Sequence, residues 1–462
     1  MNSYKYSLIV ITSLFFMWGF LTCMNDILIP HLKAVFDLKY WQAMLIQFAF
    51  FGAYFVGSVI YFVISTRLGD PINKIGYKNG LIIGLLISAL GCFLFYPAAE
   101  FVVFGFFLGA LFILGLGFTM LQIAANPYVS ILGPESSASS RLNLSQAFNS
   151  FGTTIAPLIG GYLIFEFFFD ENTSGADAVK VPYLIFGALF ILLAGVVSRA
   201  ALPAFSNEEQ LEKGLGVLKY PHLVFGILAI FTYVGGEVTI GSFIINFIGL
   251  DEIAGMEEAR AANFLAFYWG GAMIGRFLGA ISLSTIEHKR KGVLMVITSF
   301  ATFFILFGLL WGKATLLGEL FDLTFQDLLP YLGFLLLNLL CFKLGNSMPG
   351  RTLGIFAITN VVLILTSMLV NGELAMWTLL GVGLFNSIMW PNIFTLAIKG
   401  LGKYTSQGSS LLVMAILGGA LVPVFQGFLA DAISLRYSFF LPIMCYLYIM
   451  FYGFKWSKSG NS

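Results

Sequence analysis

The chain has 462 residues, of which 59% are hydrophobic and only 10% charged. An average soluble protein is about 45 to 50% apolar and about 25% charged, so the composition excludes a soluble globular domain. The formal net charge of +1 gives no indication of nucleic acid or of another strongly charged partner. The partner that this composition predicts is the lipid bilayer.

About fourteen apolar segments follow one another along the chain. In the first half they lie near residues 7–30, 43–66, 79–97, 101–130, 144–169 and 182–202. The second half adds segments near 221–249, 261–285, 293–311, 329–345, 353–371, 374–398, 408–430 and 439–454. Because backbone groups in lipid must pair internally, segments of this length are helices. The sequence predicts an all-α polytopic membrane protein with about 14 transmembrane helices.

One long polar connection, residues 203–220, divides the chain. We predict an N-terminal six-helix bundle over 1–202, a cytoplasmic linker over 203–220, and a C-terminal bundle of about eight helices over 221–462. When the connections are assigned alternately to the two sides of the membrane, Lys and Arg gather on the side that holds both termini. The positive-inside rule therefore predicts that both termini are cytoplasmic.

The two halves show a weak internal repeat. Residues 50–57, FFGAYFVG, resemble residues 268–275, YWGGAMIG, and Gln122 precedes Pro127 as Asn386 precedes Pro391. The spacing between matching positions grows along the chain by roughly the length of one helical hairpin. The repeat predicts six plus six helices with an extra hairpin inserted within about 293–350 in the second half.

Three charged residues stand inside apolar segments, where charge is costly: Asp26, Glu237 and Arg276. Asp26 is a candidate proton-coupling residue, with a hydrated or bend-capping carboxylate as the structural alternative. Glu237 either holds a proton and accepts hydrogen bonds from a polyol or forms a buried ion pair with Arg276. Arg276 follows a group of small residues and is interpreted as structural.

Neutral amides form a second set of candidates. Gln122 and Asn126 share one helical face, as do Gln146 and Asn149. Asn386, with Trp390 one turn later, predicts a comparable face in the second half. Amides both donate and accept, so they suit an uncharged, hydroxyl-rich ligand, whereas the alternative is that they join helices. The candidate substrate-binding residues are Asn25, Gln122, Asn126, Gln146, Asn149, Glu237, Trp269, Asn386 and Trp390.

Other chemistry lacks candidates in the sequence. No phosphate-binding GxxxxGK[ST] loop occurs, which disfavours an ATP-driven pump. His31, His222 and His288 lie at segment ends, and the four cysteines stand singly, so neither a metal site nor a nucleophile triad is predicted. We expect no cofactor, no metal and no enzymatic activity.

Several long strings resemble the fucose, galactose and hexose proton symporters of the major facilitator superfamily, and in particular their glucose/galactose branch. They are FFMWGFLTCMNDILIPHLK, MLQIAANPYVSILGPESSASSRLNLSQAFNSFGTTIAPLIGG, YVGGEVTIGSF, FYWGGAMIGRF and LFNSIMWPNIF. The segment RLGDPINKIGYK resembles a degenerate form of the loop between helices two and three of the superfamily. This resemblance implies structural roles for Asp70 and Gly76, with the glycine allowing close approach. It also implicates Asp26 in protonation, whereas Gln122 and Glu237 exchange the acid and the amide found in the fucose branch.

The resemblance implies import of a neutral hexose with protons by alternating access across a bacterial inner membrane. Polar residues of the two bundles would converge near mid-membrane. Alternatives left open are an N-acetylglucosamine or fucose carrier, coupling to sodium instead of protons, and a membrane sensor or scaffold that does not transport. The sequence does not predict the oligomeric state.

Overall fold

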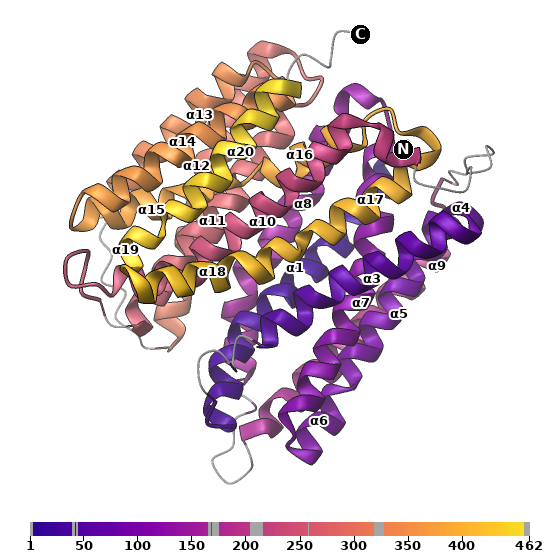
Figure 1. The fold of residues 1–462 in the computed structure, drawn as a ribbon, viewed down its shortest axis with the longest axis horizontal. Coiled ribbons are helices and arrows are strands. Elements are labelled where there is room, and N and C mark those ends of the chain that lie inside the picture. Colours follow the sequence, from indigo (N-terminus) through magenta and orange to yellow (C-terminus); the bar gives the residue numbers. More distant parts are fainter. Residues whose placement is uncertain are drawn as a thin grey trace. The chain divides into compact units, whose positions relative to one another are not determined.

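The structure is a computed structural model that describes residues 3–38, 42, 45–164, 168, 175–203, 216–256, 258–317 and 328–456. All of the regular elements in these ranges are helices, which confirms the predicted all-α fold (Figure 1). Most of the predicted linker, residues 204–215, lies outside the described part of the chain. The predicted bounds of the linker and of the two bundles therefore stay a prediction.

The helices of the first half follow the predicted apolar segments closely. They are α1 (Ser3–Val35), α3 (Leu45–Leu68), α4 (Pro71–Ile75), α5 (Tyr77–Phe93), α6 (Phe95–Phe101), α7 (Phe104–Ile131), η1 (Glu135–Ser137), α8 (Ala138–Tyr162), η3 (Gly175–Val179) and α9 (Lys180–Arg199).

The second half is also helical, and three of its membrane-length segments are divided between two or more helices. Its elements are η4 (Gly216–Lys219), α10 (Pro221–Ile248), α11 (Glu258–Ser282), α12 (His288–Leu317), α13 (Leu329–Gly345), α14 (Pro349–Leu369), α15 (Glu373–Asn386), α16 (Met389–Ile398), η5 (Gly402–Tyr404), α17 (Thr405–Met414), η6 (Ala415–Leu417), α18 (Gly418–Ala432), α19 (Leu435–Ser438) and α20 (Phe440–Trp456).

The number of membrane-spanning segments is lower than predicted. Within the described residues, 12 helical segments are long and apolar enough to cross a membrane, against the expected count of about 14. The helix α13 has 17 residues, which at about 1.5 Å each gives only about 25 Å. The helix α8 carries Ser, Asn, Gln and Thr along its length, so its apolar character is weak. The main prediction, a polytopic helical membrane protein, is confirmed.

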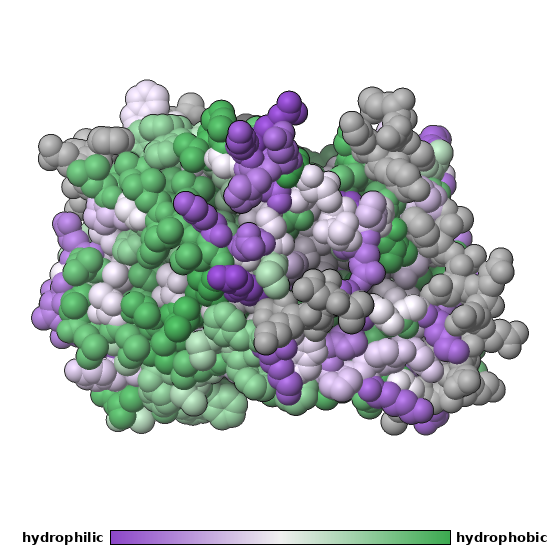
Figure 2. All heavy atoms as spheres, turned by 90° about the horizontal axis from the view of Figure 1, so that it is seen from above, coloured by the Kyte–Doolittle hydropathy of each residue, from purple (hydrophilic) through white to green (hydrophobic). Residues whose placement is uncertain are grey.

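Large apolar side chains lie on the surface of the protein. Leu68, Leu369 and Phe428 are 67%, 75% and 68% exposed. Figure 2 shows hydrophobic residues spread over much of the face drawn, with hydrophilic residues gathered in patches. A soluble monomer rarely exposes so much contiguous apolar surface, whereas lipid covers it without cost. The chain is a multi-pass membrane protein.

The chain forms two compact units. Unit 1 comprises Met1–Gly133, Phe151–Val224 and Ile398–Ala420, and unit 2 comprises Pro134–Ser150, Phe225–Ala397 and Leu421–Ser462. The units therefore differ from the sequence halves. Residues 134–150 of the first half join unit 2, and residues 398–420 of the second half join unit 1.

Unit 1 is held together by close contacts between helices at small residues. The helix α5 packs against α7 and α9, and α3 packs against α7. A Cβ atom at Gly91 of α5 would lie 2.5 Å from the backbone nitrogen of Leu114 on α7. Because lipid supplies no hydrophobic drive between helices, such close backbone approach is a main source of their association.

Unit 2 repeats this arrangement. Here α14 packs against α15 and α20, and α11 packs against α15. The pattern matches α11 to α3, α14 to α5, α15 to α7 and α20 to α9. The helices α12 and α13 have no counterpart in this scheme. They cover residues 288–345, so the packing supports an inserted hairpin close to the predicted range of about 293–350.

The tightest helix contact in unit 2 generates a prediction. A Cβ at Gly383 of α15 would overlap the backbone carbonyl of Tyr268 on α11. We expect Gly383→Ala to destabilise the protein by about 1–3 kcal/mol, because backbone atoms cannot move aside as a side chain can. Thermal unfolding in detergent measures the effect.

The matched control is Gly308→Ala on α12, where a Cβ would meet nothing within 4 Å. This variant should unfold at the same temperature as the parent or slightly higher, because Ala favours the helix. Equal stability of the Gly383→Ala variant and the parent would contradict the proposed close packing.

Candidate functional site

The helix α1 carries Asn25 and Asp26 in the middle of unit 1. Asn25 is 1% exposed, and in the described part of the protein neither its amide nitrogen nor its amide oxygen has a hydrogen-bond partner. Asp26 follows it on α1, one helical turn beyond Thr22, but its side chain lies outside the described residues. The role of Asp26 therefore stays a prediction.

Helices α1, α3 and α7 converge around Tyr54 in the same unit. The buried Tyr54 hydroxyl faces the side chains of Gln122 on α7 and of Trp18 and Thr22 on α1. Phe118, one turn before Gln122, lies 6.4 Å from Trp18 between ring centroids. The predicted residue Gln122 thus lies in a buried polar patch bounded by aromatic rings.

The amides of α7 are only partly satisfied. Gln122 is 4% exposed and Asn126 is fully buried. The Asn126 side-chain nitrogen donates to the Gln122 backbone carbonyl at 3.0 Å. Within the described residues, Gln122 Oε1 and Asn126 Oδ1 accept no hydrogen bond. A buried acceptor without a partner costs about 1–3 kcal/mol, so these oxygens and Asn25 form a set that a ligand rich in hydroxyls would satisfy.

A charged cluster lies in unit 2. The Tyr233 hydroxyl donates to Glu237 Oε1 at 2.5 Å, and the Arg276 guanidinium lies 3.8 Å from the same oxygen. Both charged groups are more than nine-tenths buried. Glu237 therefore has the ion-pair contact that the sequence offered as one alternative. The pair is loose enough for the carboxylate to keep further acceptor capacity.

Arg276 also supports a break between α15 and α16. Pro391 has no N–H, so it cannot bond the carbonyl of residue 387, four positions earlier. Arg276 Nε donates to this freed Ser387 carbonyl at 2.9 Å, and its guanidinium also donates to the Ser150 hydroxyl. One buried guanidinium thus satisfies a helix break and faces a carboxylate, in agreement with the structural interpretation of Arg276.

Asn386 lies at the end of α15 and joins four helices. Its side-chain nitrogen donates to the Tyr268 hydroxyl at 2.8 Å, while its oxygen accepts from Tyr446 at 2.7 Å and from Asn360 at 2.8 Å. The Tyr268 hydroxyl in turn donates to the backbone carbonyl of Glu237 at 2.8 Å. Asn386 therefore holds α11, α14 and α20 around α15, and only one of its N–H groups remains for a ligand.

The common face predicted for Asn386 and Trp390 stays a prediction. The helix is interrupted between them, because α15 ends at Asn386 and α16 begins at Met389. Trp390 stacks on Phe394 at a centroid distance of 4.9 Å and is 7% exposed. The proline that breaks the helix thus separates two residues whose spacing suggests one face.

The remaining predicted binding residues are divided between the units. Gln146 and Asn149 lie on the part of α8 that belongs to unit 2, whereas Gln122 and Asn126 belong to unit 1. Gln146 is buried and Asn149 half-buried. Trp269 is half-buried beside Tyr268, with ring centroids 5.0 Å apart.

The sequence places Tyr233 one turn from Glu237 on the same helical face, but sequence reasoning missed Tyr54, Tyr268, Tyr446 and Asn360. Tyr54, Tyr233, Tyr268 and Tyr446 are all buried, and each hydroxyl contacts a candidate residue or its backbone. The chain has 19 tyrosines, so residue type alone does not distinguish these four. The available signal was that a Tyr in a buried part of a span needs a partner for its hydroxyl.

Asp70 and Gly76 lie at the two ends of the short helix α4, outside the spans. Asp70 caps α4 by accepting from the Ile72 N–H at 2.9 Å, and it accepts from the Tyr61 hydroxyl at 2.5 Å. Burial raises the pKa of the Asp70 carboxyl, and the hydrogen bonds from Tyr61 and Ile72 oppose that rise. Gly76 has φ of 80°, and a Cβ there would meet nothing within 4 Å. The expectation that Gly76 allows close approach is wrong; the left-handed backbone requires this glycine.

Apolar membrane-spanning helices with buried amides and a buried charged pair define a membrane transporter. A family model described as the Major Facilitator Superfamily matches residues 7–325, and the chain belongs to this family.

Proteins similar to this chain are named as sugar transporters or symporters. A protein named glucose/galactose transporter from Brucella abortus is 42% identical over 99% of this chain and 96% of its own length. A putative glucose/galactose transporter of Helicobacter pylori is 38% identical over 98% of this chain and 97% of its own length. The crystal structure of the fucose:proton symporter of Escherichia coli matches with a TM-score of 0.75 and 29% identity, covering 98% of this chain and 99% of that one.

The helix break generates a prediction. Arg276→Ala should destabilise the protein by about 3–5 kcal/mol, because Glu237 and the Ser387 carbonyl both lose a buried partner. Pro391→Ala restores an N–H that can bond Ser387. The double variant should therefore recover about 1 kcal/mol relative to the sum of the single effects. Thermal unfolding of the parent, the two single variants and the double variant measures this coupling. If the two destabilisations simply add, Arg276 does not stabilise the helix break.

Proposed function

We infer that this protein is a secondary active transporter that imports a neutral hexose, of the glucose/galactose type, together with protons. The observation that carries this conclusion is the 42% identity, over nearly the full length, to a protein named glucose/galactose transporter. The relation to a protein named L-fucose-proton symporter, 31% identical over 98% of this chain, supports proton coupling. We further propose that the protein lies in a bacterial inner membrane with both termini cytoplasmic, and that it is not an enzyme.

The buried polar groups support an uncharged substrate. The unpartnered buried atoms of unit 1 include those of three neutral amides in helices α1 and α7, Asn25, Gln122 and Asn126. An anionic substrate calls for cations in the site. In unit 2, however, the buried Arg276 already contacts Glu237 and the Ser387 carbonyl. We propose that the amides of unit 1 bind sugar hydroxyls and that Glu237 adds an acceptor in unit 2.

Residues whose hydrogen bonds lie within the protein have a different role. Asn386, Tyr268 and Tyr446 hold helices of unit 2 together and position the backbone of α10 at Glu237. We propose that Asn386 acts mainly as a positioning residue. Gln146, Asn149, Trp269 and Trp390 stay candidates for sugar contact. Asp26 stays the candidate for proton coupling.

Three alternatives within transport can be tested in the same assay. A 6-deoxy sugar such as fucose is favoured by the fucose symporter relatives. An N-acetylated sugar and sodium coupling are the others that the residues allow. A membrane sensor that transports nothing would leave the buried unpartnered amides without a function.

The coupling proposal predicts the behaviour of Asp26→Asn. Proteoliposomes with the parent protein should accumulate labelled glucose or galactose when the outside is more acidic, without sodium. Asp26→Asn should lose this accumulation, because the amide cannot carry a proton, while it keeps exchange of labelled for unlabelled sugar. Full accumulation by the variant would remove Asp26 from coupling, and accumulation only with sodium would overturn proton symport.

The binding proposal predicts the behaviour of Glu237→Gln. Loss of a charge-assisted hydrogen bond of about 1.5–3 kcal/mol should weaken sugar affinity about 10- to 100-fold, as measured by equilibrium exchange or by calorimetry. The control is Tyr233→Phe, which removes the neighbouring hydroxyl and leaves the carboxylate. If Glu237→Gln lowers only thermal stability and leaves the affinity for every hexose unchanged, Glu237 is a structural ion-pair partner.

A further inference from the structure

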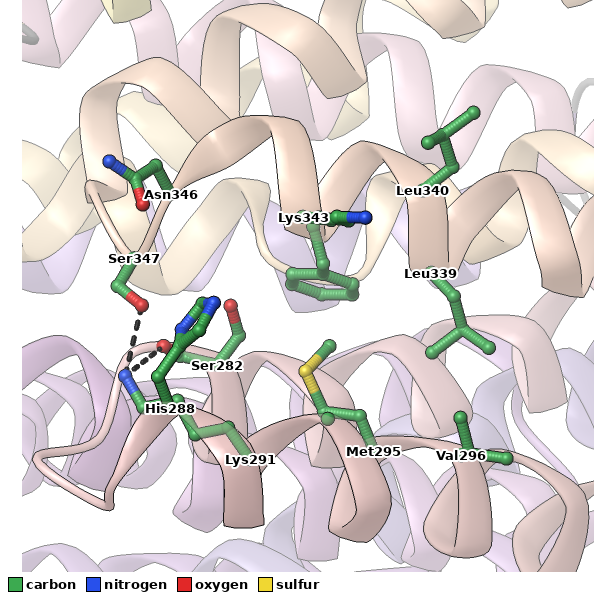
Figure 3. A pocket seen from close by; sticks show the side chains of 12 residues that line it. Ser282, His288, Lys291, Met295, Val296, Leu339, Leu340, Lys343, Asn346 and Ser347 are labelled. Carbon is green, nitrogen blue, oxygen red and sulfur yellow. Dashed lines mark hydrogen bonds between the residues drawn. The ribbon is translucent and has the colours of Figure 1, made fainter.

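The inserted hairpin encloses a cavity of its own. A cavity of about 390 Å³ lies between α12 and α13, and all of its lining residues fall within 282–347 (Figure 3). None of the candidate sugar or proton residues lines it. The cavity therefore belongs to the hairpin that has no counterpart in the first half of the chain.

Basic side chains line the cavity. Lys291 Nζ donates to the Ser282 carbonyl at 3.0 Å and to the Ser347 hydroxyl at 2.9 Å, as the dashed lines in Figure 3 show. An ammonium group has three donors, so one remains. Lys343 and His288 also line the cavity, and no Asp or Glu is among its lining residues. The positive charge of the two lysines is thus not neutralised by the residues that line the cavity.

Apolar side chains also line the cavity. Figure 3 shows Met295 and Val296 extending from α12 and Leu339 extending from α13 into the same space. Val296 and Leu340 are 47% and 50% exposed. The apolar lining therefore continues onto the outer faces of the two helices, which lipid covers in a multi-pass membrane protein.

A ligand that satisfies both kinds of lining residue must be amphipathic and anionic. We propose that the α12–α13 cavity binds an anionic phospholipid, with its headgroup phosphate at Lys291 and Lys343 and an acyl chain along Met295 and Leu339. Basic pockets between transmembrane helices on the cytoplasmic side bind the headgroups of anionic lipids. The charge distribution of the sequence predicts that this end of the hairpin is cytoplasmic. A neutral hexose offers neither the charge nor the apolar chain that the cavity accommodates.

The cavity offers variants that separate binding from folding. A Cβ at Gly292, which lines the cavity, would meet nothing within 4 Å. Gly292→Leu therefore fills space without displacing neighbours. Lys343→Gln removes one charge from an exposed side chain, whereas Lys291 holds the Ser282 carbonyl and is avoided. Lys289→Gln is the matched control for the loss of one charge. Lys289 is exposed on α12, the helix of Gly292, and does not line the cavity.

The experiment measures thermal unfolding of the full chain in phosphatidylcholine nanodiscs with or without phosphatidylglycerol. Phosphatidylglycerol should raise the unfolding temperature of the parent and of Lys289→Gln by at least about 2 °C. The rise should be lost in Gly292→Leu and reduced in Lys343→Gln. Native mass spectrometry should show one retained phosphatidylglycerol in the parent and none in Gly292→Leu.

Three results would overturn the proposal. The first is an unfolding temperature of the parent that phosphatidylglycerol does not raise. The second is an equal rise of the unfolding temperature in the parent and in Gly292→Leu. The third is an equal rise when inorganic phosphate at matched ionic strength replaces phosphatidylglycerol. The last result would indicate a site for a free anion. Sugar uptake does not enter these measurements, so they test the lipid site independently of the transport function.

Discussion

The structure depends on the cost of leaving a polar group unpaired in hydrocarbon. At the break between α15 and α16 a proline frees the Ser387 carbonyl, and a buried guanidinium from α11 satisfies it at 2.9 Å. The same guanidinium lies 3.8 Å from Glu237 on α10. The break, the cation and the carboxylate are thus linked, because removing any one leaves another buried group without its partner.

Close helix packing makes this arrangement possible. Arg276 reaches α15 because Gly275 and Gly383 bring the backbones of α11 and α15 into contact, where any Cβ would overlap a neighbour. Asn386 then fixes the neighbouring helices through two tyrosine hydroxyls and the Asn360 amide. Unit 2 therefore satisfies nearly all the hydrogen-bonding capacity of its central amide internally. Other buried amides keep unpartnered oxygens, among them Gln122 and Asn126 in unit 1 and Asn338 in unit 2.

Much of the fold is predictable from the sequence, and the reason is the bilayer. The length of an apolar segment identifies a membrane helix without knowledge of the helices around it, so hydropathy predicts the segments. The spacing of the internal repeat predicts the inserted hairpin. The number of membrane-spanning helices is less predictable, because α8 is weakly apolar and α13 is short. The charged candidates are also visible, since Glu237 and Arg276 stand out from an apolar background. Tyr233 is visible too, because it lies four positions before Glu237 on the same helix. Tyr268 and Tyr446 are not, because contacts between helices distant in sequence decide which tyrosines are buried.

The helix break shows why the spacing of two residues along the chain does not by itself decide whether they share a helical face. Asn386 and Trp390 are four positions apart, which in a continuous helix gives one face. Pro391 lies just beyond them, and its effect reaches back to the carbonyl at 387, inside the interval. A proline therefore alters the face relationship of residues that precede it by up to four positions. In this chain Asn386 bonds to tyrosines of its own unit, while Trp390 stacks on Phe394. Among the buried candidate residues of unit 2 that the structure describes, Glu237 has both a charge and unused acceptor capacity, and for this reason the contact between substrate and protein in that unit is expected to involve α10.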